Sequence, residues 1–307
     1  MYYVLFAVWY LFSLLPFRVH YWISDLLYVV VYRVVGYRVK VVRNNLSTSF
    51  PEKTPEELRR IERDFYSWFC DYIVETVKMF SMSEKTMRKR MQYEGIDQLN
   101  EDVSRGRSVS LMLGHYCNWE WVSSIPLYIH DKEVVCAQLY HPIENKAMDH
   151  LFFYSRGRCH ATSIDMNDAF RLLGGWKKEG KRSITGYISD QVPGYGAMHY
   201  WPWFLNHDTP AYTGAERIAR VLDTTVYYID LYRPRRGYYV AKFIKMCEQT
   251  KDVPKFGLTE QYYQMLEQTI RRNPEYWLWS HNRWKRTREQ FNKEFSEEER
   301  KRILSKL

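Results

Sequence analysis

Apolar side chains dominate the first 37 residues of the chain. Residues 1–17 contain no charged side chain, and a second apolar run over residues 21–32 is interrupted only by Asp25. The first run is at the lower limit for a helix that crosses a bilayer, for which about 20 residues are usual. We interpret residues 1–37 as a hydrophobic membrane-anchoring segment that either spans the membrane or lies at its interface. The alternative is a pair of core helices in a soluble domain.

Helical periodicity follows in residues 38–90. Thr54-Pro-Glu-Glu57 supplies a capping threonine, a proline at the first helical position and two acids in the first turn, which is typical of a helix start. Apolar residues then recur at intervals of three and four from Ile61 to Val77, so this helix has one buried face. We predict a helical connection packed on the main domain, in which the polar and basic residues 81–90 form a link.

From residue 91 onward, short apolar runs alternate with helical segments. Such alternation predicts an α/β fold with helices packed on a sheet, here over residues 91–284. The predicted strands are residues 108–113, 133–139, 160–164, 183–189, 224–231 and 238–246. The predicted helices are residues 119–129, 145–156, 167–178, 213–222, 258–272 and 274–284. Residues 285–307 form a charged C-terminal tail, with a surface helix expected after Ser296.

Charge and aromatic content add an expectation about partners. Lys and Arg number 45 against 36 Asp and Glu, so an anionic partner is expected: lipid headgroups, an acidic protein or nucleic acid. Aromatic residues make up 17%, which suits a membrane interface or base stacking. No recognised nucleic-acid-binding motif is present, and basic residues instead flank the apolar N-terminus, so we expect no nucleic acid. Because these basic residues follow the first apolar run, the positive-inside tendency puts the protein body in the cytoplasm.

The stretch Gly114-His-Tyr-Cys-Asn-Trp-Glu120 carries the main candidate chemistry. It follows a predicted strand, and Asn118 is a good helix-capping residue, so Glu120 falls in a first helical turn from which the chain can fold back toward His115. A histidine held by a carboxylate is a general base. The alternative is an acid favoured by the helix dipole beside an ordinary polar histidine.

Cysteine and metal chemistry are not expected. The five cysteines are widely spaced and contain no CxxC pair, which indicates reduced thiols. Cys117 beside His115 would need a lowered pKa and its own base to act as an acylated nucleophile. No pair of histidines has HExxH or comparable ligand spacing, so no metal site is predicted.

Three further stretches have the composition of binding sites. Arg156-Gly-Arg158 puts two guanidiniums at a helix end, where they suit a phosphate or simply a capped terminus. Ser189-Asp-Gln-Val-Pro-Gly194 follows an apolar strand, the position at which open α/β sheets bind ligands, although it is also ordinary turn chemistry. The helix that begins near Thr213 has free amides that suit an anion, or it is an ordinary cap.

These stretches together carry a resemblance to a known family. Gly114 to Glu120 resembles the H-x4-D/E acyltransferase signature, and its GH-x-x-N-W-E form is similar to that of the lipid A biosynthesis acyltransferases, the lauroyl and myristoyl transferases of Gram-negative bacteria. The similarity covers nearly the whole chain. The other matching stretches, in order, are Arg43-Asn-Asn-Leu-Ser-Thr-Ser-Phe-Pro51, Arg156-Gly-Arg158, Ser189-Asp-Gln-Val-Pro-Gly194, Thr209-Pro-Ala211 and Trp277-Leu-Trp-Ser-His-Asn-Arg-Trp-Lys285.

The resemblance implies a fold, a location and a reaction. The fold is a mixed sheet flanked by helices, like that of glycerol-3-phosphate acyltransferase, with N-terminal membrane-anchoring helices. The location is the cytoplasmic face of the bacterial inner membrane, and the process is lipid A and lipopolysaccharide biosynthesis. The reaction is transfer of a fatty acyl chain from acyl carrier protein, or from coenzyme A, to a hydroxyl of a lipid A precursor, without a further cofactor.

Site residues are also implied by the resemblance. His115 acts as general base, and Glu120 fixes its tautomer and steadies the imidazolium, so no acyl-enzyme is required. The residues expected to bind substrate are Asn118, Arg156, Arg158, Asp190 and Gln191.

The chain departs from the family pattern at two positions that leave the acceptor open. Ser189 stands where many relatives have proline, and Asn282 interrupts a run that is often basic. The alternatives are therefore an acyltransferase for a lysophospholipid or an amino-acid lipid, or a non-catalytic lipid-binding protein on the same fold.

Overall fold

A seven-stranded sheet forms the centre of the molecule. The computed structural model describes residues 2–306, and the strand order is β1-β9-β8-β2-β5-β3-β4. β8 and β9 pair antiparallel, whereas every other neighbouring pair is parallel, so the predicted mixed α/β sheet is confirmed. The strands are β1 (Met91–Glu94), β2 (Val109–Leu113), β3 (Val135–Tyr140), β4 (Thr162–Asp165), β5 (Ser183–Ile188), β8 (Thr225–Arg235) and β9 (Tyr238–Cys247).

Strand β2 lies in the middle of this sheet because all five of its side chains are apolar or small enough to be buried. A strand covered on both faces has a continuous buried run of this kind, rather than alternating burial. β2 pairs in parallel with β5, with Leu113 opposite Ile188. The segments that follow β2 and β5 therefore leave the sheet at the same edge, side by side.

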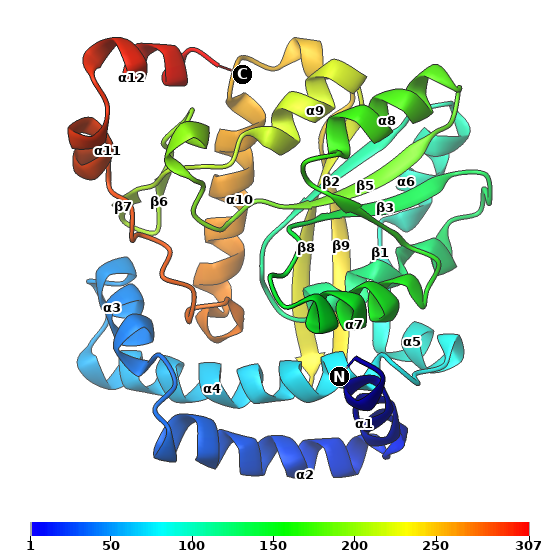
Figure 1. Cartoon of the computed structure of the whole chain (residues 1–307), viewed down its shortest axis with the longest axis vertical. Helices are drawn as coiled ribbons and strands as arrows, with labels where there is room; N and C mark the ends of the chain where they lie inside the picture. Colours follow the sequence, from blue (N-terminus) through cyan, green and yellow to red (C-terminus); the bar gives the residue numbers. More distant parts are fainter. Residues whose placement is uncertain (1, 307) are drawn as a thin grey trace.

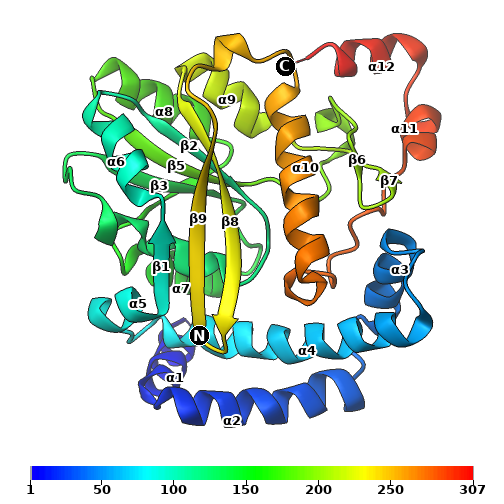
Figure 2. The same ribbon diagram turned by 180° about the vertical axis from the view of Figure 1, so that it is seen from behind.

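Helices cover both faces of the sheet, as the two opposite views show (Figures 1 and 2). The helix α10 packs on β2 and β8, so that it lies close to the end of β2. The helices of this body are α6 (Ile96–Ser104), α7 (Lys146–Gly157), α8 (Ala169–Lys178), α9 (Gly214–Leu222), α10 (Gly257–Arg272) and the 3-10 helix η2 (Trp119–Tyr128).

The N-terminal helices lie together along one end of the molecule, at the bottom of Figure 1. They are α1 (Tyr2–Leu14), α2 (Phe17–Tyr28), the π-helical segment η1 (Val29–Val34), α3 (Val39–Ser49) and α4 (Pro55–Lys78). The predicted start of α4 is confirmed, because Thr54 and Glu57 form a reciprocal capping box. Its buried face packs against α1, α2 and α3.

Among the described residues, no single helix has the length and hydropathy to cross a bilayer. The helical segments Tyr2–Leu14 and Phe17–Val34 satisfy both criteria only as a pair, and they meet at a bend of 114°. The membrane-anchoring role of this segment stays a prediction. So do the predicted domain boundaries, whose outermost residues, 1 and 307, lie outside the described part.

Several predicted elements need correction. Residues 84–90 form the helix α5 (Glu84–Arg90), capped by Ser83, where only a link was predicted. The predicted helix over residues 119–129 is a 3-10 helix that contains Pro126. Residues 274–284 form only the short turn η5 (Pro274–Tyr276), because Trp277 and Leu278 pair with the chain after β2 instead of with their own helix. β1 and α6 were not predicted at all.

The C-terminal tail contains two helices, α11 (Arg288–Glu294) and α12 (Glu297–Leu304). The surface helix predicted after Ser296 is confirmed, with Ser296 and Glu299 forming its capping box. The remaining short elements are η3 (Tyr195–Ala197), β6 (Trp203–Phe204), β7 (His207–Asp208) and η4 (Thr250–Asp252).

Candidate active site

The loop that joins β2 to η2 is tightly constrained. A Cβ atom on Gly114 would lie 2.6 Å from a methyl group of Leu266 on α10, so only glycine fits without displacing that side chain. Cys117 has a left-handed φ of 52°. Its backbone N–H donates to the carbonyl of Tyr276 (2.9 Å), and the N–H of Leu278 donates to the carbonyl of His115 (3.1 Å). The segment after α10 therefore holds the loop in shape.

His115 is held by Asp190, which lies two residues after the end of β5. The Nδ1 atom of His115 lies 2.5 Å from Oδ1 of Asp190, and the backbone N–H of His115 donates to Oδ2 (2.8 Å). Trp277 donates its indole N–H to the same Oδ2 (2.7 Å). Burial alone would raise the pKa of Asp190, but the charge and hydrogen bonds of His115, with the bond from Trp277, lower that pKa to about 2. An ionised Asp190 makes Nδ1 the protonated nitrogen and leaves Nε2 unprotonated, as a base requires.

The sequence predicts that Glu120 orients this imidazole, and the structure corrects that prediction. Both carboxylate oxygens of Glu120 accept hydrogen bonds from Arg156, at 2.7 Å to Nε and 2.7 Å to Nη2. Burial alone would raise the pKa of Glu120, but Arg156 lowers it, so the pair is ionic. Glu120 lies on η2, and its carboxylate reaches Arg156 on α7 rather than the imidazole. The contact on Nδ1 belongs to Asp190.

The other predicted site residues divide into two groups. Gln191 lies at the site, with its amide nitrogen 3.3 Å from Nε2 of His115, and Arg156 lies there as the partner of Glu120. Asn118 is fully buried, and both ends of its amide contact protein groups rather than the cavity. Arg158 points away to donate to the carbonyl of Met82 (3.2 Å) and lines a separate surface hollow beside α1.

A cavity of about 540 Å³ opens in front of His115. Its polar lining includes His115, Glu120, Arg156 and Gln191, and its apolar lining includes residues of α7, α9 and the ends of β3 and β5. A narrower apolar pocket of about 60 Å³ adjoins it, since Trp119, Glu120, Leu139, Arg156 and Ile188 line both. The site therefore combines a base, a fixed cation and an apolar recess, which suits a substrate with a polar reacting group and a hydrocarbon chain.

Two contacts of the site were missed from the sequence. The pairing of Asp190 with His115 was missed, although both residues follow apolar strands, a signal that places them at one edge if the strands are neighbours. His281 was also missed: its Nε2 accepts from the N–H of Val192 (3.4 Å), which requires a neutral ring. Burial and the charge of Arg283 lower the pKa of His281 to about 4.

The thiol of Cys117 does not suit a nucleophilic role. Cys117 is fully buried, and burial raises the pKa of its thiol well above the usual value, which disfavours the thiolate that a nucleophile needs. Within residues 2–306, no three His, Cys, Asp or Glu side chains are arranged to hold a metal ion.

The chain is similar to bacterial lipid A biosynthesis acyltransferases. The model of the bacterial lipid A biosynthesis acyltransferases matches residues 1–286. The chain is 21% identical over 253 residues to the lipid A biosynthesis palmitoleoyltransferase of Escherichia coli (strain K12), covering 81% of this chain and 79% of that protein. It is 22% identical over 273 residues to the lipid A biosynthesis lauroyltransferase of the same organism, covering 88% and 87%. A lipid A biosynthesis acyltransferase of Shigella flexneri matches at 21% identity over 81% of this chain and 79% of that protein.

Proposed function

Because this chain belongs to the family of bacterial lipid A biosynthesis acyltransferases, and is therefore an acyltransferase, we propose that it moves a fatty acyl chain from acyl carrier protein to a hydroxyl of a lipid A precursor. The observation that carries the chemical part of the proposal is the pair of His115 and Asp190 at the wall of the cavity. With Nδ1 bonded to Asp190, the unprotonated Nε2 is the ring nitrogen available to a substrate.

The proposed reaction proceeds directly between the two substrates. Nε2 of His115 accepts the proton of the acceptor hydroxyl while the hydroxyl oxygen attacks the thioester carbonyl. Asp190 stabilises the imidazolium that forms, as the acid of a catalytic triad does. The tetrahedral intermediate then collapses, the carbon–sulfur bond breaks, and the thiolate takes the proton back from His115. No acyl-enzyme is formed, and no cofactor is needed besides the acyl donor.

The oxyanion of the intermediate needs a positive charge or hydrogen-bond donors. We assign this role to Arg156 and Gln191, which line the cavity together with His115. Glu120 acts on Arg156 by fixing the plane of its guanidinium through two parallel hydrogen bonds. The adjoining apolar pocket, with Gly186 and Ala137 among its lining, is the proposed site of the acyl chain.

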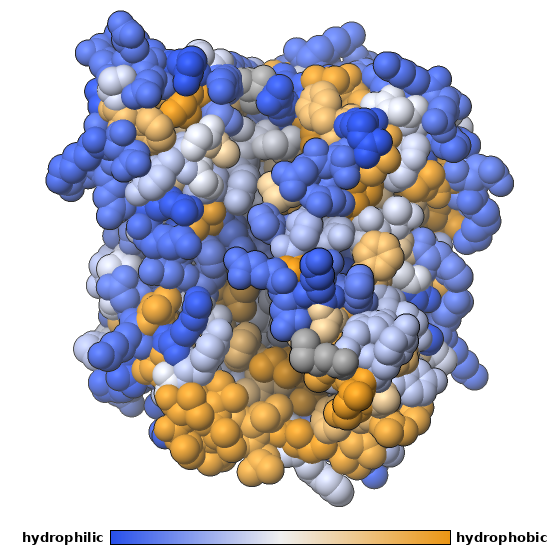
Figure 3. Space-filling model, viewed as in Figure 1, coloured by the Kyte–Doolittle hydropathy of each residue, from blue (hydrophilic) through white to orange (hydrophobic). Residues whose placement is uncertain are grey.

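Attachment to the cytoplasmic face of the inner membrane is part of the proposal. Large apolar side chains are exposed on the N-terminal helices, including Tyr3 (83%), Trp22 (71%) and Val34 (75%). Figure 3 shows the hydrophobic surface that results along the lower edge, over α1 and α2. The bent pair of helices suits a position in one leaflet, where an exposed apolar face meets lipid. Such a position brings the cavity to the acceptor lipid.

The proposal is tested by assaying acyl transfer from acyl carrier protein to a lipid A precursor. His115→Ala should lower kcat by at least about 10³-fold, because proton removal and the rest of the base chemistry are lost together. His130→Ala, a change at an exposed histidine outside the cavity, is the matched control and should keep wild-type activity. A His115→Ala protein that folds and retains activity would contradict the mechanism.

The identity of the acceptor is tested in the same assay. A lysophospholipid and an amino-acid lipid are offered as competing acceptors, because Ser189 and Asn282 depart from the family pattern. Mass spectrometry of lipids from cells with and without the gene gives the answer in the cell. Loss of one acyl chain from lipid A is the expected result, and unchanged lipid A with a changed phospholipid would overturn this part of the proposal.

A further inference from the structure

We propose that Glu75 is a positioning residue for acyl transfer, which holds Asn118 and thereby the short loop between His115 and Glu120. The inference rests on the proposed function for its meaning in catalysis. Glu75 lies on α4, outside the cavity, and has no exposed surface. It therefore contacts the residues that support the active-site loop and does not itself touch the reacting groups.

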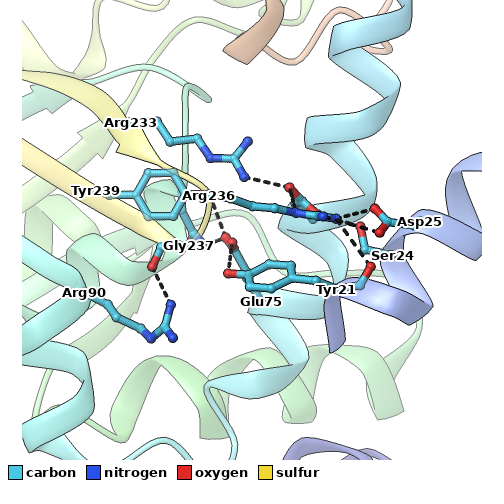
Figure 4. Close-up of polar contacts among 11 residues, drawn as sticks. Tyr21, Ser24, Asp25, Glu75, Arg90, Arg233, Arg236, Gly237 and Tyr239 are labelled. Atoms are coloured by element: carbon cyan, nitrogen blue, oxygen red, sulfur yellow. Dashed lines mark hydrogen bonds and ion pairs between the residues drawn. The ribbon is translucent and has the colours of Figure 1, made fainter. Parts of the chain in front are cut away.

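Three side-chain donors from three different elements meet at the Glu75 carboxylate. Oε1 accepts from the hydroxyl of Tyr21 on α2 (3.0 Å). Oε2 accepts from the amide of Asn118 (2.8 Å) and from the hydroxyl of Tyr239 on β9 (2.7 Å). Figure 4 shows Glu75 between Tyr21 and the β8–β9 hairpin, close to Arg233. A buried carboxylate that accepts three hydrogen bonds holds the elements that supply the donors in fixed relative positions.

Asn118 transmits this fixed position to the active-site loop. Its Nδ2 donates to Glu75, while its Oδ1 accepts from the backbone N–H of Trp121 (3.3 Å) and caps η2. Asn118 stands three positions after His115 and two before Glu120. The loop also contains Cys117 in a left-handed conformation, so it depends on outside contacts to keep its shape.

The same carboxylate connects the loop to the N-terminal helices. Tyr21 reaches Glu75 from the face of α2 that lies against the body, while its neighbour Trp22 is exposed. The hydroxyl of Tyr21 lies directly on Gly237 at the hairpin tip, where an added Cβ would come within 1.8 Å of it. Glu75 therefore contacts both Tyr21, which packs α2 on the hairpin, and Asn118, which belongs to the active-site loop.

The test reverses the direction of one hydrogen bond. In Asn118→Asp, an oxygen replaces Nδ2 and faces Oε2 of Glu75. The assay is run at alkaline pH, where the two buried carboxyl groups cannot share a proton and therefore repel each other, while the remaining oxygen can still cap η2. We expect kcat to fall about ten- to a hundredfold with KM within about twofold, because the reacting groups are displaced while the cavity is unchanged. In Glu75→Gln/Asn118→Asp, the amide is on residue 75 and the acceptor is on residue 118. This double variant should recover kcat to within about fivefold of wild type.

The control and a second measurement separate positioning from general stability. Tyr21→Phe removes one donor from the same carboxylate without touching Asn118, and it should change kcat less than about threefold. Each protein is also compared by thermal unfolding and by the ¹⁵N-histidine NMR signals of His115, which should shift in Asn118→Asp and return in the double variant. The proposal is overturned if the double variant is no better than Asn118→Asp in the NMR signals, or if the loss of kcat follows the fraction of unfolded protein. An inactive wild type with the expected NMR cycle would refute the proposed function alone.

Discussion

At the scale of single residues, the site depends on which acid contacts which partner. Two carboxylates flank His115 at similar burial, 2% exposed for the Asp190 side chain and 4% for Glu120, yet they have different partners. Asp190 bonds to the imidazole and Glu120 to a guanidinium. The difference follows from local geometry: Asp190 leaves a strand beside His115, whereas Glu120 lies on a 3-10 helix that faces α7. The two acids therefore affect different steps of the proposed reaction.

Exchange of Asp190 for asparagine tests its role directly. Oδ2 of Asp190 accepts from both the backbone N–H of His115 and the indole of Trp277, so in Asp190→Asn the amide oxygen is expected at that position and the amide nitrogen faces Nδ1 of His115, which loses its acceptor. We expect kcat to fall about 10³-fold or more, as expected when the orienting acid of a histidine base is lost. The downfield proton signal of the His115 Nδ1–H should disappear in Asp190→Asn and persist in Glu120→Gln. Its persistence in Asp190→Asn would show that another group holds the ring.

The lowered pKa of His281 predicts a pH dependence of stability. The ring stays neutral in the folded protein down to a pKa of about 4, while an unfolded chain has a histidine pKa of about 6.5. Between these values the unfolded state binds the extra proton, so the free energy of unfolding falls as pH decreases from about 6.5 to 4, by about 2–3 kcal/mol from this group.

Chemical denaturation of two variants at pH 7 and pH 4.5 measures this contribution. His281→Gln keeps an acceptor for the N–H of Val192 but does not titrate, so it should lose less stability than wild type between the two pH values. His130→Gln changes an exposed histidine and should lose as much as wild type. Equal losses in all three proteins would show that His281 does not titrate as expected.

At the scale of elements, most strands and helices were predictable from the sequence because their apolar runs are long. The predicted strand over residues 183–189 ends within one residue of β5, and the predicted helix over 258–272 begins one residue after α10. The failures occurred where tertiary contacts override local pattern. Trp277 and Leu278 have apolar spacing that suits a helix, but the N–H of Leu278 bonds to the carbonyl of His115 and so leaves helical geometry.

The site itself was predictable only in part. His115, Arg156, Asp190 and Gln191 were predicted as site residues from the sequence and its family resemblance. In the structure, His115, Arg156 and Gln191 line one cavity and Asp190 bonds to His115. The partner of His115 was not predictable, because it depends on β2 and β5 being neighbours although strands β3 and β4 lie between them in the chain. Strand order in a mixed sheet is not contained in the periodicity of any one strand.

The contact between α2 and the β8–β9 hairpin predicts a large effect of a small change. Gly237 has a φ of +75°, and an added Cβ would meet the Tyr21 hydroxyl at 1.8 Å and Arg90 at 2.7 Å. Gly237→Ala should therefore destabilise the protein by about 2–4 kcal/mol, from backbone strain together with the displacement of Tyr21.

Gly106 provides the matched control for this prediction. It has a φ of +86°, but nothing lies within 4 Å of its added Cβ, so Gly106→Ala carries the backbone strain alone, about 1 kcal/mol. Denaturant unfolding of both variants gives the two free energies. If Gly106→Ala and Gly237→Ala were equally destabilising, the contact with Tyr21 would contribute nothing.

At the scale of the whole molecule, the exposed apolar surface is unevenly distributed. The exposed apolar side chains are concentrated on α1, α2 and η1, at one end of the body (Figure 3). The chain has an excess of basic residues, 45 against 36 acidic ones, which favours an anionic surface beside that end. An anionic phospholipid monolayer provides both an apolar interior and negative headgroups.

Vesicle binding measures this prediction. In the double variant Trp22→Ser/Leu26→Ser, two side chains that are 71% and 64% exposed lose their apolar surface. Partition onto vesicles with anionic phospholipid should weaken about a hundredfold or more, from roughly 1.5 kcal/mol or more for each of the two side chains. Trp203→Ser, a change at a tryptophan that is 64% exposed on β6, is the control and should bind as wild type does. Equal binding by all three proteins would contradict attachment through α2.

The pairing of α2 with the β8–β9 hairpin also sets an order of events during synthesis. Arg236 bonds to the carbonyl of Tyr21, 215 residues earlier in the chain. Likewise, β1 has no neighbouring strand until β9 has been synthesised. At about 5–20 residues per second, a ribosome takes roughly 10–40 s to synthesise the β8–β9 hairpin after it has synthesised α2. During this interval α4 is already available to pack against α1 and α2, but the hairpin contact is missing. A membrane that receives these helices in this interval does so before the active site exists.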